Sequence, residues 1–330
     1  METSFNCPCC HTNNWCRVKE YHYESQTNKK LENSNNKHIP GFISTRRQIL
    51  FNVWFPNQNK VVLTSIYCNT CGFMCYSPRP GKDDLQAKYQ YLSERGSVGV
   101  LSNPTPRALR LDHQRELFMN RMIARHHNVA LQKVLDVGGG DGRLLRPFLK
   151  DNCGCYLVDF NAKSYPGVKR IGSTLNDLPS GSFFDILVCS HVLEHVSDPG
   201  EFLKQLRSLL TNNGVVYIEV PREIWQGIPI KTDPVTHINF FTVNSLKHAL
   251  LLNGLQPLSI ESKFAPYDGK YKRVIWAVAH AAQVKTLLSN VGGSDTKKLI
   301  KPGPLSKLSR RVENFYLKKI LNLPLAISKN

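Results

Sequence analysis

Segments with strand and helix character alternate through the middle of this chain. Short apolar runs predict strands, and apolar residues three or four positions apart predict helices. The predicted strands lie near 133–137, 154–159, 168–171, 184–189 and 214–220, and the predicted helices near 142–151, 199–210 and 242–253. Strands that alternate with helices of this length predict an α/β fold built on a doubly wound, mostly parallel sheet of the seven-stranded type. Its last strand is either 274–279 or 323–328, and the pattern does not choose between them.

The flanking regions have different patterns. Alternating apolar and polar residues predict strands at 47–54 and 60–67, and helical spacing at 83–94 and 106–127 predicts helices that cover the ligand pocket. These patterns divide the chain into four parts. The parts are a small β module at 1–80, a helical linker or lid at 81–127, the core at 128–262, and a basic C-terminal extension at 263–330 that can include the last core strand.

Composition narrows the class of protein. The 330 residues are 41% hydrophobic, which is enough for a substantial core and does not indicate disorder. No apolar signal region follows Met1, and no apolar run approaches the roughly 20 residues of a membrane span. We therefore expect a cytoplasmic protein, in which ten cysteines indicate metal ligands or free thiols more than disulfides.

Positive charge is concentrated at the C-terminal end. The formal net charge is +18, and residues 263–330 contribute 14 Lys or Arg against three acids. Leu305, Leu308, Val312 and Phe315 recur at helical spacing among these basic residues. A basic amphipathic helix of this kind can lie on an anionic membrane surface, contact nucleic acid, or pack its apolar face while its lysines stay in solvent.

The segment Lys133–Arg143, KVLDVGGGDGR, carries the strongest ligand-binding signal. An apolar strand ends in Asp136 and enters a glycine loop, which lets a ligand lie against bare backbone. The spacing is D-x-G-x-G-x-G, formed with Gly138, Gly140 and Gly142, and it does not fit the G-x-G-x-x-G of dinucleotide-binding loops. The acid favours a ligand with a positive group.

A second acid supports this interpretation. Asp159 ends the next predicted strand, roughly 20 residues after the glycines, where a ribose-binding carboxylate is expected. Its two oxygens can accept hydrogen bonds from both ribose hydroxyls. Two acids at neighbouring strand ends and a glycine loop agree on a nucleoside ligand with a positively charged group.

These residues resemble the S-adenosylmethionine (SAM) site of class I methyltransferases of the type 11 and type 23 groups. Phe184–Pro199 resembles the fourth strand and following helix of that family, and the resemblance covers about 105–262. It implies that Asp136 and the glycines hold the methionine end and that Asp159 holds the ribose. The other implied contacts are Phe160 on one adenine face and Leu175, Asn176 and Asp177 near the adenine edge. From their position after the fourth strand, we expect Ser190 and His191 at the edge of the pocket. Many relatives carry an acid where this chain has Thr174.

Two C-x-x-C pairs stand near the N-terminus. Cys7 with Cys10 and Cys68 with Cys71 can together form a tetrahedral four-thiolate Zn²⁺ site, although 57 residues separate the pairs. Buried free cysteines are the alternative. This region resembles the zinc-binding module that precedes some methyltransferases acting on sugars. Because four thiolates leave no open coordination position, the implied role of the zinc is structural.

His191-Val-Leu-Glu194-His195 also matches H-x-x-E-H, a signature of one class of zinc metalloprotease. The context opposes that interpretation, because the segment directly follows a buried strand in a chain with a nucleotide-type loop. We expect either a catalytic role for His195 or a structural one at the start of a helix.

Methyl transfer needs in-line placement and, where the acceptor loses a proton, a base. His237, in a loop after the fifth predicted strand, is the candidate general base, and its alternative role is packing beneath the helix that begins at Thr242. Sugar C-methyltransferases of similar build use a histidine in this loop, with a glutamate just before it and a tyrosine nearby. Thr236 and Pro234 occupy those places here, which leaves O- or N-methylation open.

The sequence therefore predicts a SAM-dependent methyltransferase that acts on a small molecule, such as a sugar-like or nucleotide-linked metabolite of surface glycan or secondary metabolism. One alternative is an RNA methyltransferase that grips RNA with the zinc module and basic tail, which is less favoured because the module lacks a basic-aromatic stripe. A second alternative is a non-catalytic binding protein that keeps the fold. The basic tail could add peripheral contact with an anionic membrane.

Overall fold

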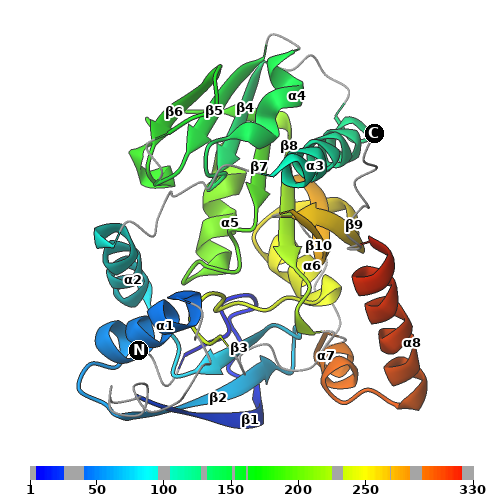
Figure 1. Ribbon diagram of the computed structural model, residues 1–330. Helices are drawn as coiled ribbons and strands as arrows, with labels where there is room; N and C mark the ends of the chain where they lie inside the picture. Colours follow the sequence, from blue (N-terminus) through cyan, green and yellow to red (C-terminus); the bar gives the residue numbers. More distant parts are fainter. Residues whose placement is uncertain are drawn as a thin grey trace, which may run out of the picture.

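The computed structural model describes residues 5–25, 41–95, 105–127, 132–150, 153–160, 163–224, 233–267, 269–282 and 292–321. Within these ranges the chain forms a large mixed sheet and a smaller antiparallel sheet (Figure 1). No helix among the described residues combines the length and apolar character that crossing a bilayer requires.

The large sheet has seven strands in the order β6-β5-β4-β7-β8-β10-β9. The strands are β4 (Lys133–Val137), β5 (Gly154–Val158), β6 (Val168–Gly172), β7 (Phe184–Ser190), β8 (Leu210–Pro221), β9 (Leu255–Tyr267) and β10 (Lys270–Ala281). All neighbours are parallel except β10, which is antiparallel to both β8 and β9. The predicted α/β, mostly parallel sheet is confirmed. Of the two candidates for the last strand, 274–279 lies inside β10, and 323–328 falls outside the described residues.

Helices cover both faces of this sheet because successive strand residues point to opposite sides. Val134 and Ile186 pack in one apolar cluster, and the adjacent Leu135 and Leu187 pack in the other. The first cluster includes residues of α3 (Pro106–Ala124) and α4 (Arg146–Leu149), and the second includes residues of α5 (Pro199–Ser208) and α6 (Val243–Leu252). This arrangement leaves the carboxyl ends of β4, β5 and β7 free to hold a ligand.

The helix predicted at 142–151 does not form as one continuous α-helix. The chain makes a 3₁₀ turn at Arg143–Leu145 and then one short α-helix, α4. Pro147 lies in the first turn of α4 and has no N–H to donate to a preceding carbonyl, so a continuous helix cannot pass through it.

The N-terminal part forms a three-stranded antiparallel sheet. Its order is β1 (Trp15–Glu24), β2 (Lys60–Cys68) and β3 (Met74–Ser77). The strand predicted at 60–67 is confirmed as β2, but the one predicted at 47–54 is wrong. There, α1 (Gly41–Gln48) continues into a π-helical turn, Ile49–Trp54. Ile49, Leu50, Phe51 and Trp54 are buried, a spacing that a helical turn can face toward one core.

The small sheet joins the large one through the loop before α6. Met74 of β3 pairs with Phe240 by two backbone hydrogen bonds of 3.1 and 2.9 Å. The helix α2 (Lys82–Glu94) stands at the left side of the view in Figure 1, above α1. After β10 follow α7 (Gly292–Ile300) and α8 (Pro304–Phe315), and α8 ends in a π-helical turn, Tyr316–Leu321.

Candidate functional site

The glycine loop after β4 takes a backbone path that other residues would obstruct. Gly138, Gly140 and Gly142 have φ of +69°, +68° and +76°, in the left-handed region that favours glycine. Gly139 lies directly against Asp136, and a Cβ at that position would come within 1.9 Å of the Asp136 Oδ2. The loop therefore brings bare backbone against the buried carboxylate.

Asp136 is the least compensated acid of this region. It is fully buried, and neither of its carboxylate oxygens has a hydrogen-bond partner among the described residues. Burial raises the pKa of Asp136 to about 7, although the charge of Arg115 acts in the opposite direction. Because a buried carboxylate without donors is costly, this position fits a ligand that brings a positive hydrogen-bond donor.

Asp159 stands one residue beyond β5, beside the same loop. Its Oδ2 accepts a hydrogen bond of 2.9 Å from the Gly140 N–H. The next residue, Phe160, is 59% exposed, and its ring stacks on Tyr89 of α2 with centroids 5.7 Å apart. The helix α2 thus reaches the position that sequence analysis predicts for the adenine face.

Leu175 and Asn176 lie in a 3₁₀ turn, Leu175–Asp177, that follows β6. Asp177 fixes the turn, because its Oδ2 accepts hydrogen bonds from the backbone N–H groups of Ser173 and Thr174 at 2.7 and 2.9 Å. These backbone hydrogen bonds lower the pKa of Asp177. The acid three residues after Thr174 is therefore engaged with the backbone of its own turn.

Ser190 and His191 belong to a buried polar network whose other members, Arg115 and Glu219, sequence analysis did not predict. Glu219 of β8 accepts hydrogen bonds from the Ser190 hydroxyl at 2.9 Å and from Arg115 of α3 at 3.0 Å. His191 Nε2 lies 3.2 Å from the same carboxylate, and its ring stacks on Tyr267 at 3.7 Å. Burial would raise the pKa of Glu219, but Arg115 and His191 outweigh it and lower the pKa. A largely buried arginine on an otherwise amphipathic helix has no distinctive sequence signal.

The H-x-x-E-H segment is not helical. Residues 191–197 form turns and bends, and His191 has a φ of +58°. The two histidines consequently do not stand one helical turn apart on one face, as a metalloprotease helix requires. Instead, Glu194 and His195 lie near His237, which belongs to the loop before α6. One potential metal-ligand atom from each of the three residues lies within 4.8 Å of the other two.

His195 and His237 each have one ring nitrogen fixed by a partner that can only accept. His195 Nδ1–H donates to the Thr236 carbonyl at 2.8 Å, and His237 Nδ1–H donates to Glu223 Oε2 at 2.9 Å. The rings meet edge to face with centroids 4.9 Å apart. In their neutral forms both histidines therefore keep Nε2 as an acceptor. Sequence analysis missed Glu223, which comes from the segment just after β8.

The charges around these histidines differ. Burial lowers the pKa of His195 to about 3, so that this ring is neutral. Burial also acts to lower the pKa of His237, but the hydrogen bond and charge of Glu223 outweigh it and raise the pKa. For the buried Glu194, the nearby histidines overcome the effect of burial and lower the pKa to about 2. An ionised carboxylate and two imidazole nitrogens can exchange a proton with a bound molecule or hold a divalent cation.

Residues of the N-terminal part hold the loop that carries His237. Arg79 is 2% exposed and donates hydrogen bonds to the carbonyls of Ile238 and Ser197 at 3.0 and 2.8 Å and to the Asn239 Oδ1 at 2.6 Å. Tyr76 donates its hydroxyl hydrogen to the Pro234 carbonyl.

The helix α2 holds the same loop. The buried Lys88 Nζ of α2 donates to the carbonyls of Val235 and Thr236 at 2.9 and 3.3 Å, and burial lowers the pKa of Lys88 to about 8. The small sheet and α2 therefore help to build the histidine side of the site.

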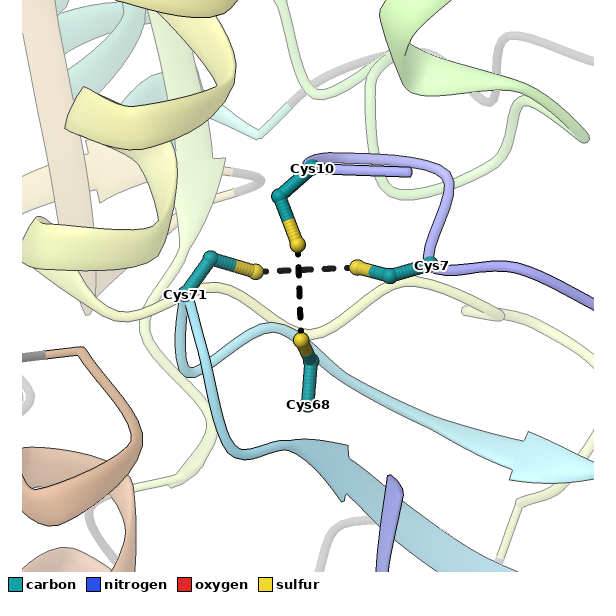
Figure 2. A group of neighbouring side chains, drawn as sticks. All are labelled: Cys7, Cys10, Cys68 and Cys71. Atoms are coloured by element: carbon teal, nitrogen blue, oxygen red, sulfur yellow. Dashed lines mark hydrogen bonds between the residues drawn. The ribbon is translucent and has the colours of Figure 1, made fainter. Parts of the chain in front are cut away.

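The four cysteines predicted as metal ligands converge at one point (Figure 2). The Sγ atoms of Cys7 and Cys71 are 3.6 Å apart, and those of Cys10 and Cys68 are 3.4 Å apart. Tetrahedral thiolates at the usual Zn–S length of about 2.3 Å would be about 3.8 Å apart. The four positions thus fit a zinc ion with small adjustments.

Both cysteine turns have the same backbone form. The residue after each pair, His11 or Gly72, has a positive φ, and its N–H donates to the carbonyl of the first cysteine at 2.7 or 2.9 Å. This explains the glycine that follows Cys71. Cys9, Cys16 and Cys75 lie outside the group of four, which selects one of the registers that the sequence left open.

The core of the chain is similar in sequence to known proteins. Residues 111–260 match the family model described as "Methyltransferase domain". Over 141 residues the chain is 24% identical to a ubiquinone biosynthesis O-methyltransferase of Rickettsia felis. The matched region covers 39% of this chain and 55% of that protein. Over 138 residues the chain is 33% identical to a tRNA U34 carboxymethyltransferase of Campylobacter jejuni, covering 39% and 46%. The chain spans about half the length of the curated relatives it matches.

Among solved structures, the chain is similar to the 1,6-didemethyltoxoflavin-N1-methyltransferase of Burkholderia thailandensis. The TM-score is 0.42 and the sequence identity is 17%, with 61% of this chain and 86% of that chain covered.

Proposed function

We propose that the protein transfers a methyl group from SAM to a small polar acceptor, such as a sugar-like or nucleotide-linked metabolite, because residues 111–260 match the methyltransferase-domain family model. The observation that carries this proposal is the Asp136 carboxylate, which is buried without a donor and lies against the Gly139 backbone. A carboxylate in this setting suits the ammonium group at the methionine end of SAM.

The other SAM contacts follow from the same strand ends. Asp159 would accept the ribose hydroxyls, and Phe160 with Tyr89 would border the adenine. Leu175 and Asn176 would lie near the adenine edge. Ser190 and His191 belong to the network of Arg115 and Glu219, and we propose that they shape the floor of the pocket more than they bind the ligand.

The histidine side of the site would receive the acceptor. When bound, SAM supplies a methyl group on a sulfonium whose leaving group departs neutral, so the protein needs no acid for it. His237, held by Glu223, would take the acceptor proton on Nε2, and Glu223 would stabilise the resulting imidazolium. His195, neutral and with Nε2 as an acceptor, would orient the acceptor by a hydrogen bond.

Three features support a polar acceptor. The side chains of His195, His237 and Glu223 are 25%, 23% and 31% exposed, so that a bound molecule can reach them. All three are hydrogen-bonding groups, which suit hydroxyl or amino substituents. Glu223 also provides the carboxylate that the residue before His237 lacks, although it comes from a different segment.

We further propose that Cys7, Cys10, Cys68 and Cys71 bind a structural Zn²⁺. Their spacing and their position in two matched turns support this. The ion would fix the turn between β2 and β3. Tyr76 of β3 and Arg79, two residues beyond it, reach the His237 loop. Its role would be to keep the acceptor side in place, with no part in the chemistry.

The proposal can be tested with methyl-labelled SAM. Purified protein is incubated separately with a nucleotide-sugar extract and with cell RNA, and we expect label in the small-molecule fraction. Label in RNA alone would favour the RNA methyltransferase alternative, and weak SAM binding without turnover would favour a binding protein.

Two variants separate binding from transfer. Asp159→Ala is expected to abolish SAM binding, and His237→Ala is expected to leave SAM binding intact and slow transfer by about 10² to 10⁴. His22→Ala, an exposed histidine of β1, is the matched control. Full activity of His237→Ala would remove this residue as the base.

A further inference from the structure

The C-terminal helix exposes its apolar side. Along α8 and the π-helical turn, six large apolar or aromatic side chains are 45–84% exposed, which is unusual for so many on one short segment. They are Leu305, Leu308, Val312, Phe315, Tyr316 and Ile320. An amphipathic helix ordinarily turns such a face toward the protein core.

Polar contacts fix this inverted orientation. Arg310 donates to the Leu299 carbonyl at 2.6 Å, and Glu313 accepts hydrogen bonds of 2.9 and 3.1 Å from Arg273 of β10. Arg273 is only 5% exposed, so Glu313 of α8 contacts a buried side chain of β10. In Figure 1, α8 accordingly stands at the outside of the molecule, next to α7. Arg310 and Glu313 face the protein, and most of the apolar side chains face outward. Tyr316 also packs against Phe264 of β9, with ring centroids 6.0 Å apart.

The charges next to the apolar face are positive. Lys307, Arg311, Lys318 and Lys319 are all exposed. The one acid between residues 304 and 321 is Glu313, and its carboxylate is bound to Arg273 on the protein side. The outward surface of this segment therefore combines large apolar side chains with basic groups that have no acidic neighbour in the segment.

We propose that residues 304–321 bind the protein to the surface of an anionic lipid bilayer. The apolar side chains would enter the boundary between headgroups and acyl chains, and the four basic groups would contact lipid phosphates. The segment, about 27 Å long as a helix, would lie in the plane of the interface. RNA would use the charges but not the apolar row, and a second copy of the chain would bring like charges together.

The test is co-sedimentation of the full chain with lipid vesicles. We expect binding to phosphatidylcholine vesicles that contain about one third phosphatidylglycerol, weak binding to pure phosphatidylcholine, and a loss of binding as salt is raised. Leu308→Glu with Val312→Glu should reduce the affinity by at least about 100-fold. Lys318→Ala with Lys319→Ala should reduce it about 30-fold.

Leu252→Glu is the matched control, because Leu252 is a 44% exposed leucine on α6, outside this segment. It should bind vesicles like the wild type, and all variants should bind SAM with unchanged affinity, which shows that they are folded. Equal binding of the Leu308→Glu/Val312→Glu variant, or no binding of the wild type to anionic vesicles, would overturn the proposal. A wild-type dimer that this variant converts to a monomer, without any vesicle binding, would assign the face to a second copy.

Discussion

Replacing Arg79 tests whether the N-terminal part positions the acceptor side of the site. Its guanidinium makes three hydrogen bonds to Ile238, Ser197 and Asn239, and it is 2% exposed. A hydrogen bond to a charged group contributes about 1.5–3 kcal/mol, and the acceptors left behind are partly rehydrated. We therefore expect Arg79→Ala to lower the free energy of unfolding by about 3–5 kcal/mol. Arg79→Lys, which can keep one of these bonds, should lose about 2 kcal/mol.

The kinetic effect should be confined to one side of the site. None of the three Arg79 partners belongs to the glycine loop or to Asp159. SAM affinity, measured by calorimetry below the unfolding transition, should therefore stay within about twofold of the wild type. The rate of methyl transfer should fall by about 10²-fold, because the His237 loop loses its support.

Chemical denaturation and transfer assays on Arg79→Ala, Arg79→Lys and the control Arg17→Ala would decide the question. Arg17 is an exposed residue of β1, and its removal should change neither quantity. If Arg79→Ala transferred methyl groups at the wild-type rate, or if it lost SAM affinity as much as activity, the positioning role would be refuted.

Three further predictions concern other parts of the structure. Gly139→Ala should weaken SAM binding by about 10²-fold or more in calorimetry, because its Cβ would overlap the Asp136 carboxylate. In a pH-rate profile, His237 must be neutral to act as base, so the rate should fall as the pH drops through its raised pKa. Glu223→Gln removes the cause of that rise and should move the acidic limb to lower pH. Metal analysis should find one zinc per chain, which Cys68→Ser/Cys71→Ser loses.

Each of these has a control within the chain. Gly303→Ala should be neutral, since a Cβ there meets nothing within 4 Å. Cys16→Ser should retain zinc, because Cys16 belongs to the N-terminal sheet but not to the group of four. A Glu223→Gln profile identical to that of the wild type would exclude the carboxylate as the cause of the raised pKa. A folded wild type without metal would eliminate the zinc site.

Local patterns were sufficient for strands β4 to β8 and the glycine loop, whereas β9 was not predicted. The run that ends at Asp136 is apolar, short and followed by glycines. The eleven residues Lys133–Arg143 therefore suffice to predict the strand, the turn and the acid. The same holds for Cys68 and Cys71, whose spacing requires a particular turn. The segment 47–54 shows the limit of such patterns, because a run this short fits a strand and a helical turn equally well.

Contacts between distant segments could not be read in this way. Glu223 and His237 are 14 positions apart and meet only because the loop before α6 returns to the end of β8. Arg115 reaches Glu219 across 104 positions, from a helix whose pattern shows only an amphipathic face. Arg79 lies in a segment that resembles a zinc module, but nothing in its neighbourhood indicates that it holds a loop 160 residues later.

The paired backbone of Met74 and Phe240 has a consequence for how this protein could change its substrate. The proposed SAM contacts all come from the large sheet and the helix α2, whereas the His237 loop is shared with the small sheet. Substitutions in residues 5–80 could reshape the acceptor side while the methyl donor site stays intact. Exchange of this module between related chains, with its loop, would be a route to new acceptors.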